Sequence, residues 1–244
     1  MRYAVIADIH ANLEAFSAVL QDIKSAGGVD RFWCLGDVVG YGPDPSSCIK
    51  LLREQKPVCI AGNHDLAVIG KLSLKDFNPD AAEAIKWTVQ QITEDDKKYL
   101  ESLPRVIEKD GFTLLHGSPR EPVWEYLISI GSAMANFNYL RTQYCLVGHS
   151  HKPLFFHQQM DGNVVSIPFN ETIGQVLSRE RCIINPGGVG QPRDGDPRAS
   201  YAIYDSQAGI IKIHRVSYDY KETQVKIMKA NLPLKLSIRL ANGV

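Results

Sequence analysis

Short apolar runs alternate with two segments that are predicted to be helical at the start of the chain. The apolar residues of segment 13–25 recur at helical spacing, and segment 44–54 carries a proline where a first helical turn would lie. The apolar runs around these segments predict buried strands at residues 3–7, 31–35 and 58–61. Strands separated by helices indicate right-handed crossovers and a mostly parallel sheet.

The middle of the chain is predicted to be helical, and the part after residue 105 to consist mainly of strands. Asn78 before a proline, and Thr93 before three acidic residues, are typical of helix N-termini. Turn-forming pairs begin at Asp161 and Ala208, where hairpins would bend. Eight strands are predicted, over residues 106–109, 112–115, 144–147, 154–157, 164–168, 182–185, 200–204 and 210–216.

Segment 234–240 is ambiguous, because it alternates like a strand while a proline and a glycine bracket it like a helix. We expect a helix there. No repeat, low-complexity tract or linker-like stretch divides the chain, so we expect one domain over residues 1–244, of the α/β (α+β) class.

Polar clusters directly follow five of the predicted strands, and they contain five of the seven histidines. The clusters are Asp8-Ile9-His10, Gly36-Asp37, Gly62-Asn63-His64-Asp65, His116-Gly117 and Gly148-His149-Ser150-His151. In open α/β sheets, sites form beyond the carboxyl ends of the strands, so these distant segments can converge. Carboxylate and imidazole groups gathered in one place are what a site for several metal ions requires.

Each cluster taken alone would more often be structural, since a lone histidine after a strand is commonly a hydrogen-bonded core residue. The joint pattern changes this balance, because buried aspartate, asparagine and histidine are costly unless they are paired or bound to metal. Residues two apart, such as Asp8 and His10 or His149 and His151, can leave the same side of an extended segment.

The bulk composition indicates an ordinary soluble protein and excludes several classes. The 27 basic and 27 acidic residues cancel, which disfavours a nucleic-acid partner. No apolar run approaches the roughly 20 residues of a membrane span, and no signal-peptide pattern begins the chain. Five scattered cysteines without a C-x-x-C pair indicate free buried thiols in a reducing compartment, so we expect a cytoplasmic protein.

The motif series D-x-H, G-D-x-x-G-x-G-P, G-N-H-D, H-G and G-H-x-H resembles the calcineurin-like metallophosphoesterase superfamily. The resemblance covers residues 1 to about 155, and the loop Asn185-Pro186-Gly187-Gly188-Val189-Gly190 extends it toward small bacterial members. It implies a sandwich of two mixed β-sheets flanked by helices. It also implies two divalent metal ions, for which the mixture of carboxylate, imidazole and amide ligands suits Mn, Fe, Zn or Ni.

Position by position, the resemblance implies a role for each polar residue. The first metal would be held by Asp8, His10, Asp37 and His151, and the second by Asp37, Asn63, His116 and His149. Asn63 would also face the substrate. His64 would be the general acid, protonating the leaving group after attack by a metal-bridging hydroxide. Asp65 either orients His64 or stabilises a loop or helix end.

Departures from the family pattern narrow the function. Protein Ser/Thr phosphatases and symmetric diadenosine tetraphosphatases show G-D-x-x-D-R-G, whereas here the motif after Asp37 ends at Gly42 without that aspartate and arginine. A protein phosphatase is therefore disfavoured. Arg193 and Arg198 could bind phosphate, or could pair with Asp194 and Asp196. The lysine-rich C-terminal segment suggests a solvated helix face.

We therefore expect a hydrolase of small phosphodiesters or phosphomonoesters, nucleotides and dinucleoside polyphosphates included. One alternative is a scaffold with this fold that serves protein contacts, as in the retromer subunit, although such relatives tend to lose the catalytic residues that this chain keeps. Another is a nuclease. A homo-oligomer is compatible with the sequence. Segments 66–103 and 119–141 lie between ligand clusters, and we expect them to wall the substrate cleft.

Overall fold

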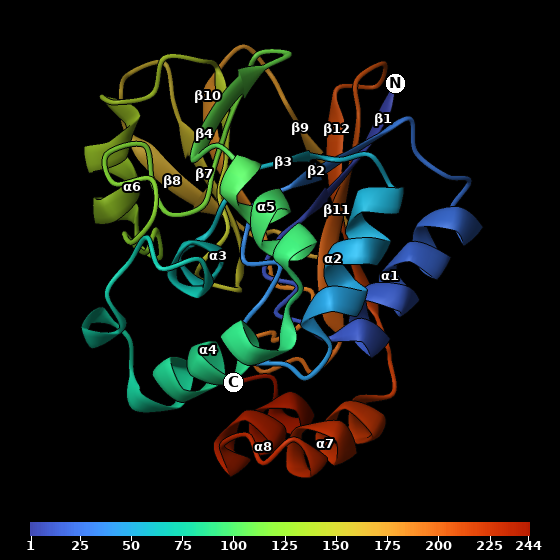
Figure 1. Cartoon of the computed structure of the whole chain (residues 1–244). Helices are drawn as coiled ribbons and strands as arrows, with labels where there is room; N and C mark the ends of the chain where they lie inside the picture. Colours follow the sequence, from blue (N-terminus) through green and yellow to red (C-terminus); the bar gives the residue numbers. More distant parts are fainter.

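A computed structural model describes all 244 residues, Met1–Val244. Two six-stranded mixed sheets form a sandwich, with helices packed on its outside (Figure 1). Apolar side chains from both sheets meet between them, among them Val5 and Trp33 from one sheet and Phe112 and Ile184 from the other. The two-sheet arrangement expected from the family resemblance is thus confirmed.

The first sheet has the strand order β3-β2-β1-β11-β12-β9. β1 pairs in parallel with β2 and β2 in parallel with β3, as the alternation of strands and helices predicted, whereas β11 and β12 add antiparallel strands. Its strands are β1 (Arg2–Ile6), β2 (Arg31–Cys34), β3 (Val58–Cys59), β9 (Gln175–Val176), β11 (Ala199–Asp205) and β12 (Ile210–Val216).

The second sheet has the strand order β4-β5-β6-β10-β7-β8. β5, β6 and β10 are parallel to one another, and antiparallel strands close both edges. Its strands are β4 (Val106–Lys109), β5 (Phe112–Leu115), β6 (Tyr144–Leu146), β7 (Pro153–Gln158), β8 (Val164–Ile167) and β10 (Arg181–Pro186).

β1 shows why apolar runs without alternation form the centre of the first sheet. Tyr3 and Val5 face the sandwich interior, while Ala4 and Ile6 face the layer of helices that covers the other side. Both faces are buried, so each position is apolar.

The helices begin where capping residues predict. The side chain of Asn12 accepts a hydrogen bond from the backbone N–H of Ala15, Asn78 does the same for Ala81, and Thr93 forms a capping box with Asp96. The helices are α1 (Leu13–Ser25), α2 (Pro45–Glu54), α3 (Asn63–Val68), η1 (Leu74–Asp76), α4 (Pro79–Gln91), α5 (Glu94–Ser102), α6 (Ile130–Phe137), α7 (Tyr220–Lys229) and α8 (Leu234–Asn242).

The ambiguous C-terminal segment is the helix α8, as expected. It packs with α7 and with α4, and the three helices surround a small apolar cluster that includes Tyr41, Ala81 and Leu236 (Figure 1). The helices α3 and α6 and the short strand β9 were not predicted. None of the helices combines the length and apolar character needed to cross a bilayer.

Parallel pairing positions the functional site. The carboxyl ends of β1, β2 and β3 lie at one edge of the first sheet, and those of β5 and β6 at one edge of the second. Backbone hydrogen bonds join the segments beyond these ends: Asp8 N–H donates to Gly36 O, and Gly148 N–H donates to His116 O. Residues far apart in the sequence are thereby held side by side.

Candidate metal centre

The structure brings together all seven residues predicted as metal ligands, and each side chain is at most 4% exposed. Three groups have ligand atoms within 4.8 Å of one another. Two contain only predicted ligands, Asp8 with His10 and His151, and Asp37 with His116 and His149, while the third joins His10 and Asp37 to His64. Asn63 joins the second group, because its Oδ1 atom lies 3.0 Å from His116 Nε2. The residues that could hold metal ions therefore form two adjacent sets.

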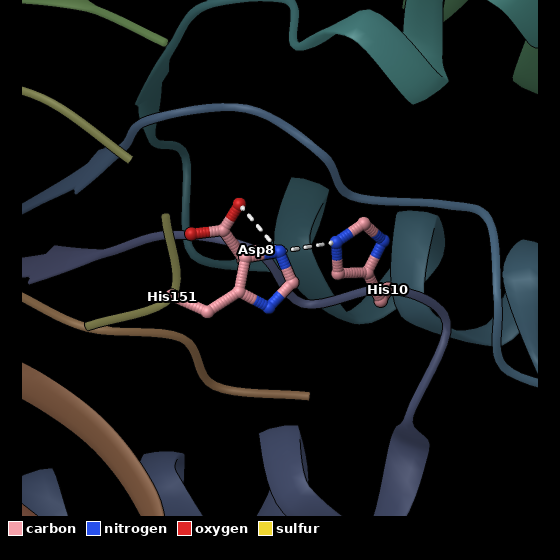
Figure 2. Close-up of side chains that lie close together, drawn as sticks. All are labelled: Asp8, His10 and His151. Atoms are coloured by element: carbon pink, nitrogen blue, oxygen red, sulfur yellow. Dashed lines mark hydrogen bonds and ion pairs between the residues drawn. The ribbon is translucent and has the colours of Figure 1, made fainter. Parts of the chain in front are cut away.

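The first set is shown in Figure 2. The Nε2 atom of His151 lies 3.1 Å from His10 Nε2 and 3.5 Å from Asp8 Oδ1. The other carboxylate oxygen of Asp8, Oδ2, is buried and has no hydrogen-bond partner. A buried carboxylate oxygen is rarely left unsatisfied, so this atom needs a cation or a proton.

The second set is arranged around the carboxylate of Asp37. Its Oδ2 atom lies 3.2 Å from His116 Nε2 and 3.6 Å from His10 Nε2, so Asp37 reaches both sets. Its Oδ1 atom accepts a hydrogen bond from the backbone N–H of His64. This central position is the one that a carboxylate bridging two ions would take.

One ring nitrogen of each of the four histidines is held by a backbone carbonyl. The pairs are His10 Nδ1 with Val39 O (3.1 Å), His116 Nδ1 with Leu35 O (2.8 Å), His149 Nε2 with Trp124 O (3.1 Å) and His151 Nδ1 with Gln191 O (2.6 Å). Since a carbonyl only accepts, the nitrogen facing it must donate.

In a neutral ring, the opposite nitrogen then carries a lone pair. The Nε2 atoms of His10 and His151 face each other and carboxylate oxygens, which are all electron-rich groups. A cation between these groups removes the repulsion. Histidine ligands typically donate a hydrogen bond from the ring nitrogen that does not bind the metal, as these rings do to backbone carbonyls. At His116, burial lowers the pKa, but the charge and hydrogen bond of Asp37 outweigh it and raise the pKa to about 9. In the metal-free protein a proton on His116 Nε2 therefore takes the place that a cation would occupy. The donor chemistry of both sets therefore fits divalent metal ions.

Burial keeps most of these imidazoles neutral. It lowers the pKa of His149 to about 3 and those of His10 and His151 well below the usual value. Burial also raises the pKa of Asp8 to about 7, whereas at Asp37 the nearby histidines outweigh burial and hold the pKa well below its usual range. Neutral imidazoles beside carboxylates are the protonation states that metal binding uses.

The backbone of the site is strained. Five of the seven residues have positive φ angles between 48° and 65°, namely Asp8, His10, Asp37, His149 and His151. A non-glycine residue in this region costs on the order of 1–3 kcal/mol and persists only where surrounding contacts impose it. Such strain gathered in one place is typical of functional sites, and nothing in the sequence signals it.

His64 lies beside the two sets and is 3% exposed. Its Nδ1 atom has no hydrogen-bond partner, and its ring packs against His10 and Tyr41. A Cβ atom on Gly40, which has φ +87°, would collide with that ring, so glycine is needed there. Burial lowers the pKa of His64 to about 4, although the charge of Asp37 acts in the opposite direction.

The carboxylate of Asp65 contacts backbone rather than the ring of His64. Its oxygens accept hydrogen bonds from the N–H groups of Val38, Val39 and Gly62, at 2.9, 3.2 and 3.0 Å. These contacts fasten the start of α3 to the loop after β2. They correspond to the second of the two expected roles, the stabilisation of a loop and helix end.

A cavity of about 160 Å³ opens beside His64 and both sets. Segment 66–103 contributes Asp76, Phe77 and Asn78 to its wall, and segment 119–141 contributes Trp124 and Tyr126, so both segments lie where they were predicted. Tyr41 and Arg193 complete the wall.

The aromatic residues of this wall were not identified from the sequence. The ring of Tyr126 stacks on that of His149, with centroids 3.9 Å apart and an interplanar angle of 17°. Phe77 and Trp124 make an edge-to-face contact at 4.8 Å. They lie in irregular segments without periodicity or motif, so only their position between ligand clusters could have indicated them.

The two candidate phosphate-binding arginines have different surroundings. Arg198 forms an ion pair with Asp196, which was the alternative to phosphate binding, and a second ion pair with Glu171. Arg193 lines the cavity and donates to the neutral Gln191 Oε1, while Asp194 pairs with Arg215 instead. Only Arg193 is therefore available at the site.

The remaining expectations concern the lysine-rich end and the cysteines. Lys226 pairs with Glu14 and Asp44, so part of the C-terminal positive charge is neutralised within the fold. All five cysteines are buried and free, as predicted.

Comparisons with known proteins agree with this geometry. Residues 1–209 match the family model described as the calcineurin-like phosphoesterase superfamily domain. An uncharacterized protein of Methanocaldococcus jannaschii is 43% identical over 245 residues, which cover 98% of this chain and 97% of that protein. A symmetrical bis(5'-nucleosyl)-tetraphosphatase of Pseudomonas fluorescens is 32% identical over 103 residues, covering 36% of this chain and 35% of that enzyme.

Solved structures show the same architecture. The crystal structure of a metallophosphoesterase from Sphaerobacter thermophilus has a TM-score of 0.90 and 46% identity, and covers 100% of this chain and 99% of its own. A hypothetical protein from Pyrococcus horikoshii has a TM-score of 0.81 at 22% identity, covering 100% and 98% of the two chains. The second likeness concerns the fold alone.

Proposed function

The chain belongs to the calcineurin-like phosphoesterase superfamily, and from this premise we propose that it hydrolyses small phosphodiesters or phosphomonoesters at a centre of two divalent metal ions. The observation that carries the proposal is the pair of histidine–carboxylate sets beside one cavity. The family and the relatives named as phosphoesterases together support a hydrolase, whereas the metal number, the metal identity and the substrate are proposals.

Each set would hold one of the two ions. One ion would take Asp8, His10, Asp37 and His151 as ligands, and the other Asp37, Asn63, His116 and His149. Two bound divalent ions supply Lewis acidity toward phosphate oxygens and activation of a water nucleophile. Manganese, iron, zinc and nickel all suit these nitrogen and oxygen donors.

We assign the general acid to His64. It lies at the cavity beside Asp37 and has an unpartnered ring nitrogen. There it can give a proton to the departing oxygen of the ester, a step typically worth about 10²–10⁴-fold in rate. The negative charge of a bound phosphate would raise the His64 pKa, in the same direction as the charge of Asp37.

Arg193 and Asn63 are the residues we assign to substrate phosphate. The guanidinium of Arg193 has a planar fork that matches phosphate oxygens, and no carboxylate in the fold occupies it. Asp65 is proposed as a structural carboxylate, since three backbone amides already take up its oxygens.

The small cavity and the names of the relatives bear on the substrate. A volume of about 160 Å³ suits a phosphoryl group with a short attachment rather than a protein segment. Symmetrical bis(5'-nucleosyl)-tetraphosphatases are among the matched enzymes, which supports nucleotides and dinucleoside polyphosphates within the proposed substrate class. Five free buried thiols support a reducing, cytoplasmic location.

The proposal is tested by assaying the purified protein with Mn²⁺ on p-nitrophenyl phosphate and bis-p-nitrophenyl phosphate. Turnover that disappears on metal removal, and falls at least about 100-fold in His149→Ala, is the expected result. Absence of turnover with every divalent metal, or full activity in His149→Ala, would overturn the proposal.

A further inference from the structure

Two arginines contact the ring of Tyr41 at the edge of the candidate site. The guanidinium carbon of Arg193 lies 5.6 Å from the ring centroid, and that of Arg239, from α8, lies 6.0 Å from it. Contacts of this kind hold a guanidinium against an aromatic ring while its N–H groups remain free to donate. The ring of Tyr41 thus connects the candidate site to the C-terminal helix.

Neither of these arginines forms an ion pair with an aspartate or glutamate side chain. Arg193 donates to the neutral Gln191 Oε1, and Arg239 Nε donates to Val244 O at 2.8 Å. By contrast, Arg120, Arg198 and Arg215 all form ion pairs. The charge of Asp80 offsets that of Arg239 only in part. An anion between the two arginines would lower the repulsion that remains between them.

The pKa of Arg239 reflects the proximity of these two positive charges. Partial burial lowers its pKa first, and the positive charge of Arg193 lowers it further. The two guanidinium groups are therefore close enough to repel each other. Both remain charged at neutral pH, since an arginine pKa is far above 7.

A groove of about 540 Å³ lies between the start of α4 and α8. Its wall consists of Asn78, Pro79, Asp80, Lys235, Ile238 and Arg239. Asn78 also lines the cavity beside His64, so the groove and the cavity adjoin at this residue. Lys235 Nζ lies 4.0 Å from Asp80 Oδ2 with its side chain 80% exposed, a weak pairing that leaves the lysine able to contact a ligand.

We propose that this groove, with Arg239 and Lys235 as its cationic side chains, is an outer anion-binding subsite for a second phosphate group of the substrate. The inference rests on the proposed function and narrows it, because a substrate that uses both regions carries linked phosphates. One phosphate lies at the metal centre beside Arg193, and the next ones extend past Tyr41 to Arg239. The leaving group is then itself a phosphate or a phosphate ester.

The experiment compares inhibition by inorganic orthophosphate and by inorganic tripolyphosphate, using hydrolysis of p-nitrophenyl phosphate by the Mn²⁺-loaded protein. Arg239→Gln should raise the inhibition constant of tripolyphosphate about 10-fold relative to that of orthophosphate, as expected for loss of a charge-assisted contact. Lys235→Gln, at an exposed position that folding does not need, should raise the same ratio about threefold.

Arg105→Gln is the matched control, since it removes one exposed positive charge elsewhere and should leave both constants unchanged. Chelation of metal by tripolyphosphate affects wild type and variants alike, so the comparison between them isolates the side chain. An unchanged ratio in both variants of the groove would overturn the inference.

A second measurement keeps the inference separate from the proposed function. If the wild-type protein hydrolyses no phosphoester, the proposed function fails, and calorimetric titration of tripolyphosphate into metal-free protein still decides on the subsite. Binding that weakens about 10-fold in Arg239→Gln, and not in Arg105→Gln, supports the subsite. Equal binding by wild type and Arg239→Gln contradicts it.

Discussion

His10 and His151 face each other with their Nε2 atoms 3.1 Å apart, and their rings stack with centroids at 4.8 Å. The Nδ1 atom of each ring lies against a backbone carbonyl, so each Nε2 carries the lone pair. Neither ring can rotate away without losing its carbonyl contact. This geometry places two electron-rich nitrogens where one cation would satisfy both.

Removing one of these rings should therefore weaken metal binding more than folding. In His151→Ala we expect loss of about one metal equivalent, measured by elemental analysis after dialysis against Mn²⁺. The wild-type protein should gain about 2.7 kcal/mol of stability at a Mn²⁺ concentration 100 times the dissociation constant. His151→Ala should lose most of this gain.

His157→Ala is the control for this variant. His157, on β7, pairs with Glu180 outside the candidate metal centre, so its removal should leave metal content unchanged. Equal metal content in His151→Ala and wild type would contradict the assignment of His151 as a ligand.

If His64 protonates the leaving group, its replacement should matter most for esters with poor leaving groups. His64→Gln should lower kcat by about 10²–10⁴-fold for an alkyl phosphate ester, whose alkoxide needs a proton, and much less for p-nitrophenyl phosphate. Steady-state kinetics on a series of leaving groups, with metal content measured in parallel, tests this. An equal loss across the series would indicate a structural role for His64 instead.

The candidate metal ligands could be predicted from the sequence because each directly follows an apolar strand. Asp8 follows β1 and Asp37 follows β2, and parallel pairing brings strand ends of this kind to one edge. The choice of tautomer could not be predicted, since it depends on carbonyls such as Val39 O and Gln191 O, which only the fold brings near. The positive φ angles at these positions could not be predicted either, because they too are imposed by tertiary contacts.

Helices α3 and α6 escaped prediction for different reasons. α3 has six residues and is buried at every position, so no apolar stripe marks it. α6 begins at a capping serine, Ser129, but its eight residues are too few for a clear period. Arg193 and Arg198 each have an aspartate nearby in the sequence. Asp194 nevertheless pairs with Arg215, a partner that only tertiary packing brings near.

Tyr126, in the wall of the cavity, contacts one of the candidate ligands. Its ring stacks on that of His149, and the residue is 47% exposed, so its removal should cost little folding stability. Tyr126→Ala should weaken Mn²⁺ affinity about 10-fold, a change typical of residues that support metal ligands. Tyr126→Phe keeps the ring and should retain wild-type affinity when Mn²⁺ is titrated calorimetrically into the metal-free protein. Equal affinities in the alanine and phenylalanine variants would show that the stacking does not position His149.

The metal-free protein should lose stability on acidification between about pH 6.5 and pH 4. Four histidines have a pKa lowered by burial, His64 to about 4, His149 to about 3 and the others well below their usual value: His10, His64, His149 and His151. In the unfolded chain they take up protons at about pH 6.5, so acid favours unfolding.

Two buried carboxyls act in the opposite direction. Burial raises the pKa of Asp8 and of Asp65 to about 7, so the folded state holds two protons that unfolded carboxylates release above about pH 4. His116, whose pKa is raised to about 9, holds its proton in both states below about pH 6 and does not change the balance there. Four histidines against two carboxyls leave the unfolded state with a net excess of two protons in the acidic part of this window. Stability should therefore fall by up to about 3 kcal/mol per pH unit as the pH decreases. Urea unfolding of the metal-free protein at pH 6, 5.5 and 5 measures this slope, and His149→Phe, which removes one titrating group, should reduce it. A free energy of unfolding that is constant or rises toward pH 5 would show that the buried histidines are not neutral in the folded protein.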